Sequence, residues 1–424
     1  MKTRVAAEQT VVTAAAAART RRTLSDFDKL WAGQTASLFG SAFTMFALPT
    51  LAVLVLHATP LQIGLLSALQ TLPFAALGMF AGVLADRASR RRIMIVADCV
   101  RCAAIVTVPV AAAFGVLGMP LLCGVALVTG TASVFFEIAY QSYLPAVVPA
   151  DGLVDANVKL QFSNSGSGIA GVALAGAFVQ RIGAAAALAV DAVSYLVSVA
   201  SLALIRTPEP AHDGPALTVS QTFREIAEGV RVVFGSADLR WMLYATATAN
   251  LGGSIVGTVA LLYAYRVLHA EPGVLGVVNG LAQLGFAGAA LSSRFQAWLG
   301  LRAALIATLA AGACATACML FAQAGMPYIM LFVSAALSAF SLTCYNVLAV
   351  SYRQARVGVR LQGRMNATMR TFVWGTIPMG ALAGGFLGTA LGITGTIAVG
   401  AALTGVSALW LLPLRERAPL AQAE

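Results

Sequence analysis

The residues with the clearest chemical potential lie in a short charged segment between two apolar stretches. The segment Gly82–Arg92 reads GVLADRASRRR and carries the acid Asp86 with four arginines, in a chain in which only 10% of residues are charged. Arginines clustered beside an apolar stretch long enough to span a bilayer indicate the cytoplasmic side. An acid and arginines at the ends of two adjoining helices could also form an ion pair that biases a two-state equilibrium.

Three further acids lie inside apolar stretches, where a charge is costly and therefore a functional candidate. Asp98 and Arg101 have i,i+3 spacing and can pair on one helix face, either as a structural pair or as part of a gate. Glu137 follows Phe135 and Phe136, which would desolvate it, and it could act as a gate acid or carry a proton.

The third of these acids is Asp191. It could carry a proton, bind a cationic substrate, or make buried structural hydrogen bonds. These interpretations of Asp98, Arg101, Glu137 and Asp191 stay open at the level of the sequence.

The composition defines the class of protein. Of the 424 residues, 59% are hydrophobic, against about 45–50% in a soluble domain, so the chain is a multi-pass membrane protein. The net charge of +10 could suggest nucleic acid, but nearly all basic residues fall in segments on one side of the expected spans. Arg181 and Arg266 fall in outer loops. We therefore expect no nucleic-acid partner and contact with anionic membrane lipids.

Several kinds of chemistry have no signature in the sequence. The six cysteines fall in apolar stretches and are expected to be small packing residues. The sequence has no glycine-rich nucleotide loop, metal-ligand cluster or nucleophile–base arrangement. We therefore expect no cofactor, no metal and no enzymatic activity. The polar, basic and alanine-rich N-terminal residues lead us to expect no cleavable signal peptide.

The apolar pattern predicts an all-α fold with twelve transmembrane helices, since about 20 apolar residues cross a bilayer. The expected spans are 33–56, 61–85, 93–115, 119–141, 160–181, 185–205, 239–265, 273–293, 301–323, 327–350, 366–390 and 394–413. They divide the chain into a cytoplasmic N-terminal segment (1–29), a six-helix bundle (30–205), a cytoplasmic linker (206–238), a second bundle (239–413) and a cytoplasmic tail (414–424).

The linker and an internal repeat support two halves. Residues Thr218 to Phe234 have an apolar stripe at helical spacing, which predicts an amphipathic helix at the membrane surface. At an offset of 209 residues, Tyr143 matches Tyr352 and Gly176 matches Gly385. These coincidences, together with six plus six spans, indicate a duplicated transporter.

The spans and the Gly82–Arg92 loop resemble the major facilitator superfamily over nearly the whole chain. A finer resemblance is to its third drug:proton antiporter group, which contains macrolide and enterobactin exporters. The matching segments are Leu30–Ser41, Leu144–Pro149 with Ala156-Asn157, Asp191–Leu196 and Gly363–Ala367. The resemblance implies two pseudo-symmetric six-helix bundles and the export of small organic molecules.

The resemblance also assigns a latch. It implies that Asp86 lies against the start of the eleventh span when the cavity opens outward. Arg90 would pair with Asp86 and with Glu137, and Gly82 would allow close helix contact. Arg91 and Arg92 are expected to be topology anchors only.

Two features depart from the family pattern. The fourth span has no arginine, so Arg101 is the only intramembrane substitute. The fifth span has Val172 where the antiporter motif has proline, so the bend that proline would give is expected to be lost in that half.

Substrate sites in this fold lie near the midplane, between the halves. Phe39, Phe43 and Phe46 fall on one stripe of the first span, which predicts either cavity lining or plain packing. Polar or aromatic side chains in other spans are further candidates: Asn250, Gln283, Tyr345, Asn346 and Trp374. Aromatic surface with sparse amides favours a bulky, mainly apolar solute.

The sequence therefore predicts a monomeric exporter of a hydrophobic drug, antibiotic or siderophore-like compound in the bacterial inner membrane. Both termini would be cytoplasmic, and the proton gradient would supply the energy. One alternative is a nutrient importer or facilitator on the same fold. Another is a transport-inactive membrane scaffold, which would have no need of a gate with two states.

Overall fold

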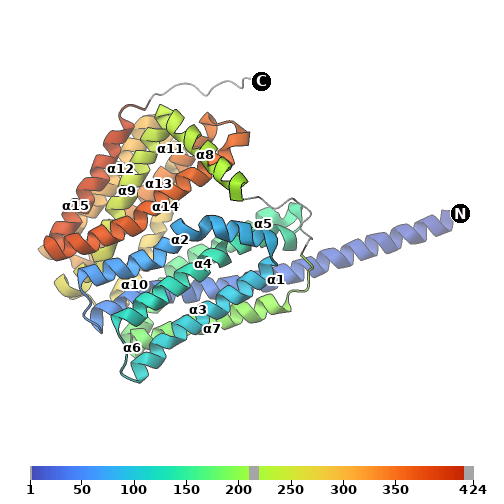
Figure 1. Cartoon of the computed structure of the whole chain (residues 1–424), viewed down its shortest axis with the longest axis horizontal. Coiled ribbons are helices and arrows are strands. Elements are labelled where there is room, and N and C mark those ends of the chain that lie inside the picture. The colour runs from blue at the N-terminus through green and yellow to red at the C-terminus, as the bar shows by residue number, and fades with distance from the viewer. Residues whose placement is uncertain (1, 210–218, 415–424) are drawn as a thin grey trace.

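The computed structural model consists of two helical bundles side by side (Figure 1). It describes the backbone of residues 2–209 and 219–414. Side chains are described for residues 26–78, 80–82, 84–85, 88–149, 151–209, 227–323, 325–358 and 361–414.

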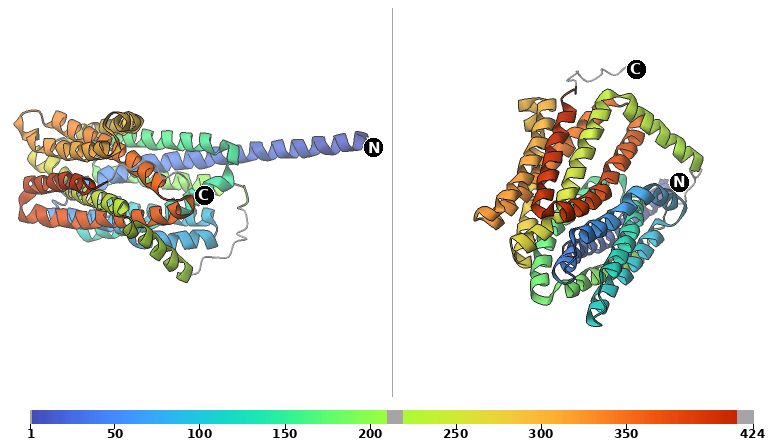
Figure 2. Two further views of the ribbon diagram at one scale, coloured as in Figure 1. Left: turned by 90° about the horizontal axis from the view of Figure 1, so that it is seen from above. Right: turned by 60° about the vertical axis from the view of Figure 1, so that its left-hand side comes forward.

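The first bundle contains six membrane-length segments. They are α1 (Lys2–Leu54), α2 (Pro60–Arg87), α3 (Arg90–Ala113), α4 (Met119–Val147), α5 (Leu153–Gly166) continued by η2 (Ser167–Gly171) and α6 (Val172–Ile182), and α7 (Ala184–Leu204); the short η1 (Ala150–Gly152) precedes α5. The N-terminal part of α1 projects well beyond the bundle (Figure 2). A capping box, in which the Thr59 side chain accepts from the Gln62 amide, starts α2 at Pro60.

The second bundle follows the linker helix α8 (Val219–Gly235). It contains α9 (Ala237–Leu262) with η3 (Tyr263–Val267), α10 (Pro272–Ala282) with η4 (Gln283–Ala287) and α11 (Gly288–Leu299), α12 (Leu301–Cys318) with η5 (Met319–Ala324), α13 (Pro327–Arg356), α14 (Val359–Ala390), and α15 (Gly392–Ser407) with η6 (Ala408–Leu411). Glycines with positive φ, such as Gly183 and Gly392, make the tight turns between antiparallel helices.

Within the described residues, eleven helical segments are long and apolar enough to cross a membrane. The eleventh expected span, 366–390, is not among these segments. It corresponds to α14, which has 32 residues and packs along α2 and α9. Its first half carries Gln362, Arg364, Asn366 and Arg370, and is therefore more polar than the other segments. The protein is an all-helical, multi-pass membrane protein.

The two bundles are joined at one end and separate at the other. At the end where α2 and α10 begin, α2 crosses α14 and α6 crosses α10 through glycines. A Cβ on Gly176 would lie 2.7 Å from the Cα of Gly276, and one on Gly64 would lie 3.0 Å from the Cα of Gly385. We call this the closed end. At the other, open end, the buried apolar residues form separate clusters in each half.

The fifth span is irregular although it lacks the proline of the family pattern. Residues Ser167–Gly171 form a turn of π-helix immediately before Val172. The small residues there allow the wider turn, and such turns often mark functional sites.

The predicted amphipathic linker helix is α8, whose first described side chain is that of Ala227. It packs on the second bundle: Val233 is fully buried among residues of α9, α13 and α14. Glu228 forms an ion pair with Arg364 of α14. The predicted linker residues 210–218 lie outside the described part of the chain.

Candidate functional site

A cavity of about 960 Å³ lies between the halves and adjoins the closed-end crossings. α1 and α2 line it from the first bundle, and α9, α10, α12, α13 and α14 line it from the second. Ile63 and Leu275, which belong to the crossing helices, form part of its wall. A change in the helix packing at the crossings would therefore alter the access of a solute to the cavity.

The cavity lining carries no charged side chain among the described residues. Its polar groups are amides and hydroxyls. They include Ser67, Gln70, Thr246, Asn250, Ser254, Asn279, Gln283, Ser334, Ser338, Tyr345 and Asn346. A large wall of apolar atoms with neutral hydrogen-bonding groups suits a neutral, amphiphilic ligand.

Four carboxamides in this wall have hydrogen-bonding capacity to spare. Many of the hydroxyls are already satisfied: Thr246 donates to Met242 O at 2.8 Å and lies 2.7 Å from the Tyr345 hydroxyl. By contrast, no protein hydrogen bond is found among the described residues for the carboxamides of Gln70, Asn250, Gln283 and Asn346. These groups can therefore orient a ligand without breaking internal bonds.

Five of the predicted ligand residues line the cavity: Asn250, Gln283, Tyr345, Asn346 and Trp374. Trp374 is 42% exposed, and its ring centroid is 5.4 Å from that of Phe74, across the boundary between the bundles. Gln70 was missed by sequence reasoning, although an amide inside the second apolar span was a usable signal.

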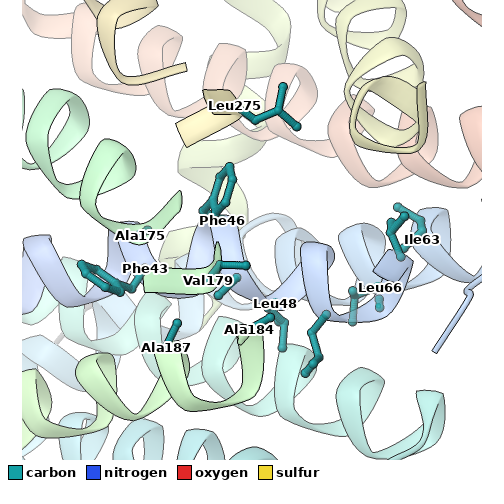
Figure 3. Packing of buried hydrophobic residues seen from close by; sticks show 14 of the residues in the cluster. Phe43, Phe46, Leu48, Ile63, Leu66, Ala175, Val179, Ala184, Ala187 and Leu275 are labelled. Carbon is teal, nitrogen blue, oxygen red and sulfur yellow. The ribbon is translucent and has the colours of Figure 1, made fainter. Parts of the chain in front are cut away.

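Phe39 and Phe43 do not line the cavity, so packing, the second of the two interpretations of the stripe, holds for them. Figure 3 shows that Phe43 and Phe46 leave α1 in different directions, and only Phe46 reaches toward Leu275. Phe43 packs edge-to-face on Phe178 of α6, with centroids 5.3 Å apart. Phe39 lies beside Gly171. The stripe is wide enough that its members face different neighbours.

A charged cluster is buried inside the first bundle, away from the cavity. Arg101 pairs with Asp98, as their spacing predicts. The Arg101 guanidinium lies 4.2 Å from the centroid of Phe136 and 4.6 Å from that of Tyr195. Two aromatic faces thus hold the cation, which compensates part of its lost hydration.

Asp191 belongs to the same cluster and is fully buried. Its carboxylate accepts hydrogen bonds from Thr44 Oγ1 at 2.5 Å and Ser194 Oγ at 3.1 Å. Gly40 of α1 faces it, and a side chain at Gly40 would collide with Ser194 and Asp191. Asp191 therefore faces the α1–α7 interface.

Glu137 is exposed, so the prediction that phenylalanines desolvate it is wrong. Its carboxylate accepts from Gln141 Nε2 at 3.0 Å. Consecutive helix residues point about 100° apart, which is why Phe136 faces Arg101 while Glu137 faces out.

The latch residues show a different set of contacts in this state. The side chain of Asp86 lies outside the described residues. No described atom lies within 4 Å of a Cβ built on Gly82 in this state, whereas the latch contact is predicted for the state that opens outward and stays a prediction. Glu209 accepts from the backbone amides of Arg90 (2.9 Å) and Arg91 (3.0 Å) and from Ser89 Oγ (2.7 Å).

Arg91 makes tertiary hydrogen bonds in addition to its expected role as a topology anchor. It donates to the carbonyls of Leu202 and Ala203 at the end of α7, both at 2.6 Å. Glu209 lies about 120 residues from its partners, and its role could not be read from local sequence.

Glu209→Gln is expected to loosen the open end of the first bundle. A carboxylate at a helix N-terminus contributes about 1 kcal/mol, and the amide would lose its charge and part of its acceptor capacity. The measurement is thermal unfolding of the purified protein in detergent. Glu137→Gln is the control, because Glu137 is exposed in the interior of α4, away from a helix N-terminus, and accepts from Gln141. Equal unfolding temperatures for the two variants would contradict the assignment.

The two bundles, the linker helix and the cavity between them define a transporter of the major facilitator superfamily. A family model described as a transmembrane secretion effector matches residues 17–423, and the chain belongs to that family. The multidrug efflux pump Tap of Mycolicibacterium fortuitum is 25% identical over 402 residues, covering 91% of this chain and 95% of that protein.

A second relative matches over a shorter stretch. Macrolide efflux protein A of Streptococcus pyogenes is 27% identical over 207 residues, which are 49% of this chain and 51% of that protein. The chain thus spans about half the length of that curated relative.

Solved structures agree on the fold. A point mutant of the nucleoside transporter NupG superposes with a TM-score of 0.74 at 11% identity, covering 92% of this chain and 99% of the other. A bacterial homologue of the iron transporter ferroportin in an inward-facing state gives 0.73 at 16% identity, with coverage of 93% and 99%. These similarities concern the fold alone.

Proposed function

We propose that the protein exports bulky, mainly apolar small molecules that carry neutral hydrogen-bonding groups. The observation that carries the proposal is the chemistry of the cavity: a large apolar wall without described charges, in which four carboxamides are free to bind. Aligned relatives named as macrolide and multidrug efflux proteins support export of this class.

Transport would proceed by alternating access. The positive-inside rule assigns the open end, which carries the Arg90–Arg92 segment, to the cytoplasm of a bacterial inner membrane. Both termini would then be cytoplasmic, and this state would admit a solute from the cell interior. Opening the closed-end crossings would release it, and we propose that a proton moving inward drives the cycle.

The cavity carboxamides should set affinity. Replacing Asn250 and Asn346 together by alanine removes two hydrogen-bonding groups worth about 0.5–1.5 kcal/mol each, so chloramphenicol binding should weaken roughly tenfold. Equilibrium dialysis with radiolabelled chloramphenicol measures the effect. Asn157→Ala is a matched control, because Asn157 is exposed and donates only to Leu153 O. Affinity equal to that of the control would argue against this cavity as the binding site.

Export is tested in an efflux-deficient bacterial host. Expression should lower the cellular accumulation of neutral chloramphenicol and should leave that of the permanent cation ethidium unchanged. Lower accumulation of ethidium alone would show that the cavity argument is wrong. Unchanged accumulation of both compounds would contradict the export proposal for this class.

A further inference from the structure

We propose that Asp191 holds the proton that drives transport, and that the proton leaves it for the cytoplasm along a polar seam between α1 and α7. That this proton drives transport rests on the proposed function, whereas the proton site itself is separate from the cavity. None of Asp98, Arg101 or Asp191 lines the cavity, so proton and solute would bind in separate places.

The charges of the cluster leave one carboxylate uncompensated. Asp98 and Arg101 neutralise each other in an ion pair with almost no exposed surface. Asp191 accepts hydrogen bonds from the hydroxyls of Thr44 and Ser194, and no described cation forms an ion pair with it. A buried carboxylate without a cation is costly, and taking up a proton removes the charge. The cluster is therefore electrically neutral when Asp191 is a carboxylic acid.

Two buried polar atoms without hydrogen-bond partners indicate that the cluster can adopt a second arrangement of hydrogen bonds. Asp98 Oδ2 and Arg101 Nε are buried and have no hydrogen-bond partner among the described residues. Arg101 is close enough to Asp191 to interact electrostatically. When Asp191 loses its proton, the guanidinium can turn to share its donors between the two carboxylates, since Arg presents five N–H groups.

The groups that face Asp191 come from every helix packed around it. α3 contributes Asp98, Arg101 and the Cys102 thiol, which donates to Ala192 O at 3.4 Å. α7 contributes Tyr195, whose hydroxyl lies near both Asp191 and Ser41 of α1. α4 contributes the ring of Phe136 beneath Arg101. Arg101 is the one cation among these described groups.

A row of hydroxyls connects this cluster to the open end. On α7, Ser194, Ser198 and Ser201 follow Asp191 at i+3, i+7 and i+10, on one helix face. Ser194 and Ser198 are buried, and Ser201 Oγ donates to Lys29 O at 2.5 Å.

The surface of α1 that faces these hydroxyls consists of small residues, which let α1 and α7 pack closely. It carries Gly33, Ser37, Gly40 and Thr44, again at helical spacing. A Cβ on Gly33 would lie 2.8 Å from the Ser201 Cβ, and one on Gly40 would lie 2.5 Å from the Ser194 Cβ. The glycines thus bring the hydroxyls against the backbone of α1. We call these residues, together with Asp191, Ser194, Ser198 and Ser201, the α1–α7 seam.

The seam also couples the proton to the cavity. Thr44 touches Asp191, and the next residues on α1, Met45 and Phe46, line the cavity. A hydroxyl bound to an ionised carboxylate is held more strongly than one bound to a carboxylic acid. Proton uptake would therefore loosen the contact of α1 with α7 and shift the helix that forms one cavity wall. Proton release to the open end would restore it: one O–H bond is formed and one is broken per cycle.

Infrared difference spectroscopy of the purified full-length protein tests the site without any substrate. Spectra recorded between acidic and alkaline pH should show the C=O band of a buried protonated carboxyl, shifted in D2O. Asp191→Asn should abolish this band, while Glu137→Gln should retain it. Persistence of the band in Asp191→Asn, or its loss in Glu137→Gln, would overturn the assignment.

Proteoliposomes then separate coupling from transport. Asp191→Asn should lose chloramphenicol accumulation against its gradient but keep chloramphenicol exchange at equilibrium. Ser198→Ala should slow proton-driven accumulation and leave exchange unchanged. If wild-type protein shows the infrared band but no exchange of the probe, the export proposal fails while the proton site stands. If Asp191→Asn still accumulates the probe, the proton site is wrong.

Discussion

Gly276→Ala is expected to hold the closed end apart and to stop net transport. The added Cβ would lie 2.7 Å from the Cα of Gly176 and 2.9 Å from the carbonyl oxygen of Val172. Both are backbone atoms that cannot rotate away, so α6 and α10 must separate. Overpacking of this kind costs about 1–3 kcal/mol, enough to shift the equilibrium away from the closed-end state roughly ten- to hundredfold.

Labelling from outside measures this shift. Ser67 lines the cavity, and in a Ser67→Cys protein an impermeant maleimide should react faster from the outer face when Gly276→Ala is present. Labelling of the native cysteines is subtracted with the parent protein. The matched control is Gly124→Ala, where a Cβ meets nothing within 4 Å. Equal labelling and equal transport in the two alanine variants would contradict the assigned role of the crossing.

Arg101→Met is expected to be the most destabilising single change in the first bundle. It would leave Asp98 buried without its described ion-pair partner and would remove the cation that lies between the rings of Phe136 and Tyr195. Breaking a buried ion pair by removing one partner costs about 3–5 kcal/mol. The folded yield in detergent and the midpoint of thermal unfolding should both fall.

A double variant distinguishes charge from packing. Asp98→Asn combined with Arg101→Met removes the unpaired acid as well, so it should recover part of the lost stability. Arg101→Lys retains the charge but loses the planar contact with both rings, and should fall between wild type and Arg101→Met. If Arg101→Met unfolds at the wild-type temperature, the ion pair does not contribute to the stability of the first bundle.

Sequence periodicity was enough to predict the helices and the neighbours that lie within one turn of each other. Apolar length places eleven of the twelve expected spans on the membrane-length segments of the described residues, with ends that differ by up to about seven residues. The Asp98–Arg101 pair follows from i,i+3 spacing alone. Polar residues inside apolar spans also identify part of the cavity wall, since Asn250, Gln283 and Asn346 need polar surroundings.

Tertiary contacts explain what the sequence could not predict. Whether Phe43 or Phe46 lines the cavity depends on where α6 packs against α1 and where α10 crosses α6. The stripe itself does not encode this arrangement. Glu209 finds its donors at Ser89, Arg90 and Arg91 only after the bundle has folded. The α1–α7 seam was visible as two sets of small residues, but only their apposition shows that they meet.

Uptake into inside-out membrane vesicles tests the account most directly. These vesicles expose the cytoplasmic face, so an acidified lumen imposes the gradient that a proton antiporter would use for export. The account predicts that wild-type vesicles concentrate radiolabelled chloramphenicol in the lumen, that the Asn250→Ala/Asn346→Ala variant does so weakly, and that collapsing the gradient releases the compound. Wild-type vesicles that accumulate the compound only under the opposite gradient, or not at all, would contradict it.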